Sequence, residues 1–550
     1  MAVDERWSNL YLYGCTAHAL RLIARSLWKA GCVVFLPVFA LINGKQRHRT
    51  SLYSSHLAQG AVMAYLMARP VLGALDEIKL WVGMFGVAQP PAVEFTVDGA
   101  PCLPATVDGL HPIRDRQRGK GYLNYQGLFT FKTRGAGCEH HIVVRAGGSF
   151  EPCTLRVFSL PAKVPQKMEG SFKILLSSCY CTETDEADVG RFIQRLPIRP
   201  DIALFAGDQV YLDQLPFETL PTTEDELRQV ISSKYQRNWT SAFTNVASLQ
   251  SALAKAPAVC LPDDHEFWNN YPWPQFWKRG TQTAPTPGGG VNIWADAALE
   301  MFQDYQVGGS AQKPWLRVDI EPLFMLFLDT RSYRKQDFDD PFGLMPEEAE
   351  QAFKHWASEL IDCQKQGIPR IGVLSTGQAL LVKTPFFDEM GDAELSSYKK
   401  QFKVIIETLE RLGQHGIQVV FLTGDVHWSR VAQATCVKRG QITLTEVICS
   451  PMSLLVTPGA DQVARLKDHL GSIFGERKRW PLHPEVELAP AYIGEKSFRP
   501  VGQKGWSGNQ VAVLEFSCLG LGVELNVTYH PVTAPASPAT KAGPFTLLNT

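Results

Sequence analysis

The sequence has no excess of charge of either sign, and this absence limits the partners of the protein. The 550-residue chain contains 54 basic and 55 acidic residues, which gives a formal net charge of −1. A protein that binds nucleic acid or an anionic membrane surface through general electrostatics carries an excess of Lys and Arg. We therefore expect no specific nucleic-acid binding, although local basic character at a site is compatible with this balance.

The sequence also lacks a secretory signal, a long apolar run and a zinc-type pair of cysteines. The chain begins MAVDERWSNL, which is polar and acidic where a signal is basic and then apolar. The apolar run from Ala30 to Ile42 contains Pro37 and is too short to span a bilayer. The 12 cysteines include no C-x-x-C pair. These absences predict a cytoplasmic protein with reduced thiols and no transmembrane segment.

The chain is longer than one hydrophobic core supports, so several domains are expected. The residue composition and the hydrophobic pattern change along it. Residues 1–65 form an N-terminal extension without a clear pattern. Residues 66–165 contain short segments rich in β-branched and aromatic residues between turns, which predicts a small all-β sandwich domain. Strand-like and helix-like segments alternate in residues 170–456, which predicts an α/β layered domain. Residues 457–550 form a C-terminal extension, with strands that complete this domain and a mobile tail rich in Pro, Ala and Thr.

The α/β region is organised around the stretch Asp201–Asp213, which reads DIALFAGDQVYLD. The apolar run Ile202–Ala206 is typical of a strand that is buried on both faces. Asp208 therefore lies just past the carboxyl end of a strand, where ligands bind in open α/β sheets. Together with Tyr211 and Asp213, it predicts a loop that aims two carboxylates and a phenol at one point. A hard, highly charged metal ion prefers such oxygen donors.

Three further strand ends carry side chains that bind metals. ILLSSC places Cys179 at a strand terminus, with Cys181 as an alternative, and LTGDVHWS supplies Asp425 and His427. The motif LPDDHEFWNN supplies Asp263, Asp264, His265, Glu266, Asn269 and Asn270. For any one of these motifs, a capped turn after a strand is the alternative reading. Four of them in one α/β region predict a polynuclear metal site.

The motifs GDQVYLD, PDDHEFWNN, FLDTRSYR and LTGDVHWS, in this order, resemble the PhoD-like (alkaline phosphatase D) branch of the calcineurin-like metallophosphatases. The resemblance covers Phe172 to Ser453, and the β-rich segment before it resembles the small sandwich domain of that family. The implied fold is a four-layer α-β-β-α sandwich with metals at the strand ends. Two features differ from the family: the usual twin-arginine signal is missing, and the first motif reads SSCYC instead of an SCQ-type sequence.

The resemblance also implies two metal sites. Most calcineurin-like enzymes begin with a D-x-H motif, whereas the PhoD-like branch has a cysteine there, which Cys179 matches. The implied Fe³⁺ ligands are Cys179, Asp208, Tyr211 and His427, with Asp208 bridging to the second metal. The implied ligands of the second metal, of the Ca²⁺ type, are Asp208, Asp425 and either Asp264 or Asn269. Other divalent metals remain alternatives at this centre.

Other side chains are assigned to the substrate. By the same resemblance, His265 would contact the substrate or protonate the leaving alkoxide. Arg331 and Arg334 follow a strand and would steady the phosphate; the alternative is an ion pair with Asp329, Asp337 or a neighbouring carboxylate. Five aromatic residues form either a lid over an organic leaving group or the packing of a loop: Trp268, Trp273, Phe276, Trp277 and Trp294.

The predicted reaction is metal-assisted hydrolysis of a phosphate ester, in which two metals polarise the phosphate and stabilise the leaving oxygen. The substrate would be a small molecule or a polymer, attacked by phosphomonoesterase or phosphodiesterase activity. The alternative is a degenerate member of the family that binds metal or partner proteins without turnover. All four motifs keep their metal-competent groups, which favours the enzyme.

Overall fold

A computed structural model of the chain divides it into residues Met1–Met63 and Ala64–Thr550. The structure describes residues 64–107, 109–148, 150–182, 185, 188–213, 221, 223–240, 249–274, 279–281, 292–308, 313–381, 394–453, 492–493, 495–496, 498–506, 508–520, 522–532 and 538–548. The predicted N-terminal extension therefore lies outside the described residues, except for its last two positions.

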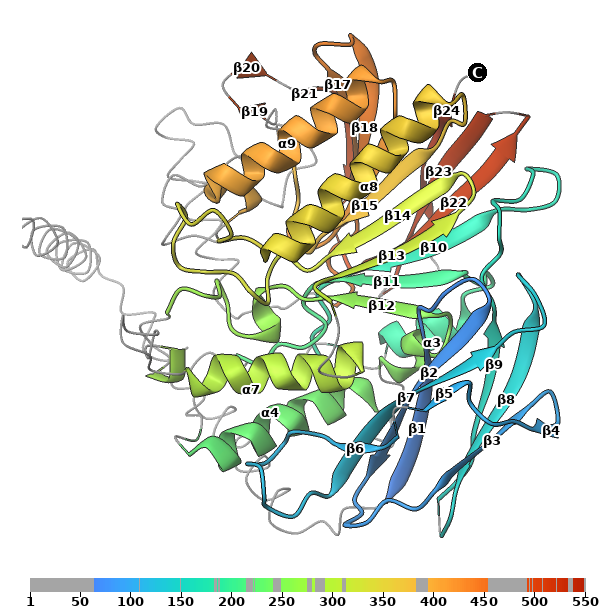
Figure 1. Cartoon of the computed structure of the whole chain (residues 1–550), viewed down its shortest axis with the longest axis vertical. Coiled ribbons are helices and arrows are strands. Elements are labelled where there is room, and N and C mark those ends of the chain that lie inside the picture. Colours follow the sequence, from blue (N-terminus) through green and yellow to red (C-terminus); the bar gives the residue numbers. More distant parts are fainter. Residues whose placement is uncertain are drawn as a thin grey trace, which may run out of the picture. The chain divides into compact units, whose positions relative to one another are not determined.

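Two large β-sheets with helices around them dominate the described part (Figure 1). The first sheet has 11 strands in the order β24 (Thr540–Leu548), β23 (Gly522–Pro531), β22 (Gln510–Leu519), β10 (Phe172–Ser177), β11 (Ile202–Ala206), β12 (Ala258–Leu261), β1 (Tyr65–Val71), β2 (Glu77–Phe85), β7 (Asn124–Lys132) and β5 (Thr106–Val107), with β6 (His111–Pro112) also paired to β7. The second sheet has seven strands in the order β13 (Trp315–Ile320), β14 (Leu323–Leu328), β15 (Ile371–Ser375), β16 (Val419–Thr423), β18 (Gln441–Ile448), β17 (Ser429–Cys436) and β21 (Phe498–Trp506). The fold is thus mixed α/β with several sheets.

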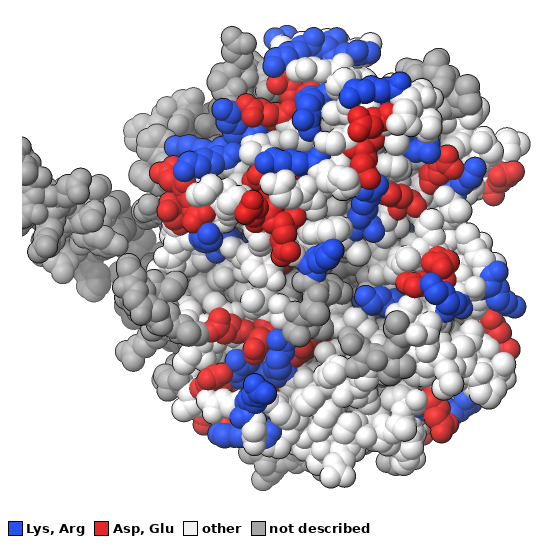
Figure 2. Space-filling view, viewed as in Figure 1, with Lys and Arg blue, Asp and Glu red and all other residues white. Residues whose placement is uncertain are grey.

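Helices lie between the strands, as the predicted alternation of strands and helices requires. They are α3 (Asp188–Arg195), α4 (Glu224–Trp239), α6 (Gln250–Leu253), α7 (Ile293–Phe302) with the π-helix Gln303–Val307, α8 (Glu347–Lys365) and α9 (Lys399–Gln414). Short 3₁₀ turns cover Asp264–Glu266, Arg279–Thr281 and Leu395–Ser397. None of the helices in this part of the chain combines the length and the hydropathy needed to cross a membrane. Figure 2 shows charges of both signs interspersed on one face, as the balanced composition predicts.

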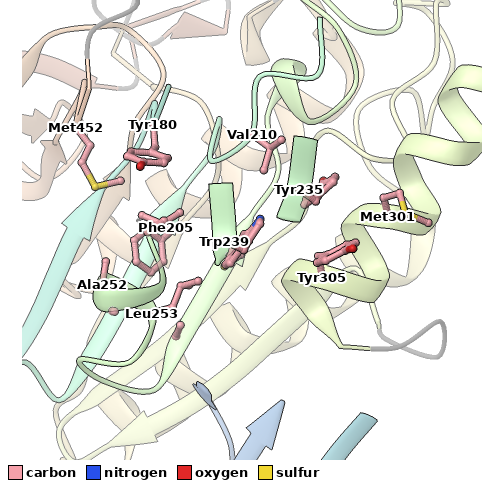
Figure 3. Close-up of a cluster of buried hydrophobic side chains, with 14 of the residues drawn as sticks. Tyr180, Phe205, Val210, Tyr235, Trp239, Ala252, Leu253, Met301, Tyr305 and Met452 are labelled. Carbon is pink, nitrogen blue, oxygen red and sulfur yellow. The ribbon is translucent and has the colours of Figure 1, made fainter. Parts of the chain in front are cut away.

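The central strands are buried on both faces, which explains their uninterrupted apolar runs. Side chains of β10 and β11, such as Ile174 and Leu204, share a core with those of β14 and β16, such as Phe327 and Leu422. The opposite face of the first sheet packs against α3, α4, α6 and α7, and Figure 3 shows part of this second core. The helices α8 and α9 pack on the second sheet in a third core.

The β-rich segment is hydrogen-bonded to the α/β region. A four-stranded sheet of β4 (Ala100–Pro101), β3 (Val93–Val97), β8 (Glu139–Ala146) and β9 (Cys153–Phe158) shares a core with β1, β2 and β7. β1 in turn pairs with β12 in parallel at Val71 and Ala258. The first large sheet therefore runs from the β-rich segment into the α/β region, while the domain boundaries themselves stay a prediction.

The C-terminal extension contains two strands that its local sequence pattern does not indicate. Within the tail predicted to be mobile, Thr540–Leu548 forms β24 and pairs with β23, where Ala542 and Leu547 are buried. Phe498–Trp506, which has no strand-like pattern, forms β21 and pairs with β17. Both strands depend on a partner strand that is already in place. The short strands β19 (Tyr492–Ile493) and β20 (Glu495–Lys496) pair only with each other.

Candidate metal centre

A buried carboxylate, that of Glu266, shapes the loop that follows β11. Its Oε1 accepts hydrogen bonds from the backbone N–H groups of Gln209 (2.7 Å) and Val210 (3.3 Å). Its Oε2 accepts from those of Asp208 (2.9 Å) and Asp263 (2.8 Å). Burial raises the pKa of Glu266 to about 7, while these hydrogen bonds favour its charged form. One side chain therefore ties the end of β11 to the end of β12.

Helix α4 holds the same loop from the other side. Lys234 Nζ donates to the Leu212 carbonyl at 2.8 Å, and Asn238 Nδ2 donates to the Gln209 carbonyl at 2.9 Å. Leu212 N–H donates to the His265 carbonyl at 3.0 Å. Because side chains and strand ends hold its backbone at several points, the loop presents its own side chains in one defined arrangement.

Two glycines of the motifs allow the strand ends to approach each other closely. Gly207 has φ +94°, and a Cβ atom there would lie 2.7 Å from the Asp263 Cβ. A Cβ atom on Gly424 would lie 2.2 Å from the Ser178 Cβ. Gly424 follows β16 of the second sheet and Ser178 follows β10 of the first, so the two sheets meet here. A glycine therefore precedes both Asp208 and Asp425, because any larger residue there would clash with the neighbouring strand end.

Backbone strain is concentrated at the four motifs. In the described part of the chain, six non-glycine residues have φ between +49° and +64°: Asp98, Cys179, Asp208, Asn270, Asp425 and His427. The left-handed region costs an L-residue roughly 1–2 kcal/mol. All but Asp98 belong to the predicted metal motifs. Strain of this kind persists where the surrounding structure imposes it, and it is typical of functional sites.

The first group of donor atoms comes from three strand ends. Ligand atoms of Cys179, Asp208 and His427 all lie within 4.8 Å of one another. Cys179 Sγ is 3.5 Å from Asp208 Oδ2. Tyr211 Oη lies 3.5 Å from the same Oδ2 atom and 3.4 Å from His427 Nε2. A thiol, a phenol, an imidazole and a carboxylate therefore converge on one point.

Asp208 is shared with a second group of donors. Its carboxylate lies within 4.8 Å of ligand atoms of Asp264 and His265, and Asp264 forms a further group with Asp263 and Asp425. The alternative ligands differ in their placement. Asp264 is 2% exposed and lies among these carboxylates, whereas the Asn269 side chain is exposed. The structure therefore brings Asp264 to the carboxylates, while the choice of Asp264 or Asn269 as the ligand stays a prediction.

Cys181, the alternative to Cys179, is also buried and packs with Cys179 and Tyr211. It belongs to none of the donor groups found among the described residues. Cys179 is the cysteine that lies beside Asp208 and His427. All ten cysteines in the described part of the chain are free thiols.

Burial governs the protonation of these side chains. Burial, together with the charge of Asp425, raises the pKa of Cys179 to about 12. Burial and the neighbouring Cys179 also raise the pKa values of Asp208 and Tyr211 well above their ordinary range. Burial and the charge of His265 lower the pKa of His427 to about 4, so its imidazole is neutral, the form that binds metals. The donor types fit bound metal ions, because thiolate, phenolate and imidazole suit transition metals and carboxylates suit hard cations.

Asp213 is predicted as a further oxygen donor at the site, but its carboxylate faces His265. Its Oδ1 lies 2.7 Å from His265 Nδ1, and it belongs to none of the donor groups. The His265 ring centroid is 4.2 Å from that of Tyr211. Burial lowers the pKa of His265, but the carboxylates of Asp213, Asp264 and Asp208 outweigh it and raise the pKa well above its usual value. The motif spacing predicts that Asp213 is near the site, but not that it faces the histidine.

Arg331 is not a free cation, because it pairs with Asp263, a member of one of the donor groups. Its fully buried Nε forms an ion pair with Asp263, and its Nη1 donates to the Tyr271 carbonyl at 2.8 Å. Arg334 is also buried and donates to Gln378 Oε1 at 2.6 Å. Arg331 therefore forms an ion pair, as the alternative predicts. Its partner Asp263 comes from the third motif and not from the segment around Arg331. Burying an arginine without a paired carboxylate costs free energy, which explains why Arg331 lies against Asp263.

The aromatic residues beside the third motif mainly pack a loop. Trp268 and Trp294 are buried, and their rings meet edge to face with centroids 5.9 Å apart. Trp268 Nε1 donates to the Trp273 carbonyl at 2.8 Å, and Trp273 stacks on Phe338. Phe276 and Trp277 lie outside the described residues.

A cavity of about 80 Å³ lies elsewhere, between β12, α7 and β13. Its lining is mainly apolar and includes Leu261, Phe302 and Trp315, but none of the predicted site residues. The convergence of donor atoms, and not this cavity, therefore locates the candidate site.

The fold and the site define a class of protein: a mixed α/β protein with a buried group of metal-binding side chains at the ends of its central strands. The family model of the PhoD-like phosphatases matches residues 176–365, and this match confirms the resemblance predicted from the motifs. The family is one of metal-dependent phosphate-ester hydrolases. The fourth motif, with Asp425 and His427, lies beyond the matched segment, and the tertiary structure brings it to the other three.

A solved structure, titled "Structure of PhoD", resembles the chain with a TM-score of 0.51 and 15% sequence identity. The similarity covers 88% of this chain and 92% of that one. At this identity, the likeness shows a shared fold alone. No protein with curated annotation matches the sequence.

Proposed function

We propose that the protein is a metal-dependent phosphoesterase whose centre holds iron and a calcium-type ion. The observation that carries this proposal is the position of Asp208, whose carboxylate belongs to two groups of donor atoms at once. A carboxylate that two groups share is suited to bridge two metals. The proposed iron ligands are Cys179, Asp208, Tyr211 and His427, and the proposed ligands of the second ion are Asp208, Asp264 and Asp425.

When bound, the two ions supply positive charge that stabilises the phosphate oxygens in the transition state. The residues hold the donor atoms apart from solvent, since Cys179, Asp208 and Tyr211 are each at most 4% exposed. Because the loop backbone is tied to Glu266 and α4, little reorganisation is needed when the ions bind. Such preorganisation is the main contribution that a protein makes to electrostatic catalysis.

His265 is proposed as the group that gives a proton to the leaving oxygen. Asp213 holds Nδ1 at 2.7 Å, which leaves Nε2 for the proton transfer. The carboxylate also favours the protonated ring, the form that a general acid needs. The alternative function, binding of metal or a partner without turnover, gives no role to a histidine that is oriented in this way. The pair therefore favours the enzyme over a degenerate member of the family.

We also propose four layers for the catalytic domain. The three cores support this arrangement, because one lies between the two large sheets and the others lie between each sheet and its helices. The β-rich residues 66–165 would form a small domain whose strand β1 pairs with β12 within the first sheet.

Metal content and turnover, measured on the same samples, test the proposed function. Purified protein is analysed for metals by mass spectrometry and assayed with nitrophenyl phosphate and bis-nitrophenyl phosphate, which separate monoesterase from diesterase activity. Asp208→Asn should lose metal and activity together. Asp201→Asn is the matched control, because Asp201 lies at the opposite end of β11 and accepts a backbone hydrogen bond from Lys173 at 2.7 Å. Metal-free wild-type protein with full activity would overturn the proposal.

A further inference from the structure

The hydroxyl group of Ser450 contacts two of the proposed iron ligands at once. Ser450 lies in the buried segment that follows β18, outside the four motifs, and its side chain is 0% exposed. Its Oγ is 3.2 Å from Cys179 Sγ. The same Oγ lies 3.1 Å from the backbone nitrogen of His427. One hydroxyl therefore joins the proposed thiolate ligand to the residue that supplies the imidazole.

The direction of each hydrogen bond follows from the atoms involved. A backbone N–H is only a donor, so Ser450 Oγ accepts from His427 and keeps its own proton for the sulfur. The hydroxyl of Ser178 also approaches the sulfur, at 3.4 Å, but lies closer to the Cys449 carbonyl, at 3.0 Å. Because Ser178 has a single hydroxyl proton, the carbonyl competes for it. Ser450 is therefore the better-placed donor to Cys179.

The position of Ser450 is itself supported by its surroundings. Its backbone N–H donates to Ser429 Oγ at 3.2 Å, and the Ser429 hydroxyl donates to the Ser450 carbonyl at 3.2 Å. The hydrogen bond from His427 N–H also helps to hold that residue at φ +49°. Ser450 thus has a fixed geometry relative to both proposed ligands.

We propose that Ser450 is a positioning residue that sets how strongly the Cys179 sulfur donates electrons to the metal bound there; this inference rests on the proposed function. A hydrogen bond to a thiolate draws electron density away from the sulfur and weakens its donation. Hydrogen bonds to ligating sulfurs tune metal centres in this way, and the groups behind the ligands fix the orientation of the ligands. Loss of the hydroxyl therefore strengthens donation by the sulfur.

The test uses Co²⁺ as the probe, bound to protein from which other metals have been removed. The charge-transfer band from thiolate to Co²⁺ should move to longer wavelength in Ser450→Ala at unchanged cobalt content. Ser450→Thr, which keeps the hydroxyl, should restore the wild-type band. Ser453→Ala is the matched control, because this buried hydroxyl of the same segment donates to the Cys181 carbonyl at 3.1 Å. It should leave the band unchanged.

An unchanged band in Ser450→Ala, beside a normal thiolate band in the wild type, overturns the inference and leaves the proposed function intact. A wild-type protein that binds Co²⁺ without a thiolate band overturns both, because Cys179 is then no ligand. If Ser450→Ala fails to fold or to bind Co²⁺, resonance Raman spectra of wild-type protein loaded in H₂O and in D₂O decide the question. The metal–sulfur stretch should shift in D₂O, and the absence of a shift overturns the inference.

Discussion

Asp213 Oδ1 lies 2.7 Å from Nδ1 of His265, so the imidazole is held by a carboxylate that belongs to none of the donor groups found among the described residues. Both side chains are buried, at 4% and 9% exposure. An imidazole that is held at one nitrogen has a defined orientation and tautomer. The pair therefore supports a separate role for His265 in proton transfer, although its ring also lies within 4.8 Å of ligand atoms of Asp208 and Asp264.

This separation predicts different effects for His265 and for the ligands. His265→Ala should retain its metals and lower kcat by about 10²–10⁴-fold on a substrate with a poor leaving group, the usual contribution of a general acid. The loss should be smaller with nitrophenol as the leaving group, which needs no proton. Asp213→Asn should show a smaller loss with the same dependence on the leaving group. Loss of metal in His265→Ala would identify His265 as a ligand instead.

Tyr211 is predicted to colour the protein. A phenolate bound to ferric iron absorbs visible light, so iron-loaded wild-type protein should show a band that Tyr211→Phe removes. Tyr235→Phe is the control, because this buried hydroxyl donates to Gln306 Oε1 at 2.8 Å and not to a proposed ligand. A colourless wild-type protein, or a band that survives in Tyr211→Phe, would remove Tyr211 from the ligand set.

Gly424→Ala should separate the two sheets at the site. The added Cβ atom would meet the Ser178 Cβ at 2.2 Å and the Ala206 carbonyl oxygen at 2.4 Å. Both atoms are fixed by the ends of central strands and cannot shift easily. We expect a lower melting temperature and reduced metal content. Gly121→Ala adds a methyl group with nothing within 4 Å and should change neither property. Thermal melts and metal analysis of both variants check this prediction.

Arg331 is predicted to stabilise the fold through Asp263. Arg331→Met leaves a buried carboxylate without its partner, a change that typically costs about 3–5 kcal/mol. The double variant Arg331→Met with Asp263→Asn should recover part of this loss. Denaturant unfolding measures both effects. If Arg331→Met instead keeps its stability and raises KM alone, the arginine acts on the substrate.

Asp115 predicts a pH dependence of stability that is independent of the metals. Burial raises its pKa from 3.8 to about 6, against a hydrogen bond from Asn124 Nδ2 that favours the charge. Because the folded state favours the neutral acid, its stability falls as the pH rises from about 4 to about 6 and then stays level. The full effect is at most about 3 kcal/mol.

Asp115→Asn should remove this dependence, so its advantage in melting temperature over wild type should grow between pH 4 and pH 6. The exposed Asp339→Asn serves as the control and should follow the wild type. An advantage that is the same at both ends of this range would contradict the prediction.

Local sequence pattern indicates the buried strands of this protein and where they end. Apolar runs such as Ile202–Ala206 indicate buried strands, and their positions agree with β10, β11, β12 and β14 to within a few residues. The Gly-Asp pairs Gly207-Asp208 and Gly424-Asp425 mark the ends of two strands. Residues at the carboxyl ends of neighbouring parallel strands share one edge of a sheet, which places Cys179 near Asp208. Asp425 follows a strand of the other sheet, and only the resemblance to a known family joins it to them.

Tertiary structure alone decided which of these side chains face one another. Asp213 turns to His265, and Arg331 pairs with Asp263, because buried charges take the nearest partner that packing provides. The strands β21 and β24 form because β17 and β23 offer free edges, which no local pattern reveals. Ser450 carries no sequence signal, since it is far from Cys179 along the chain. Its contact with the sulfur exists only because the two sheets meet at Gly424.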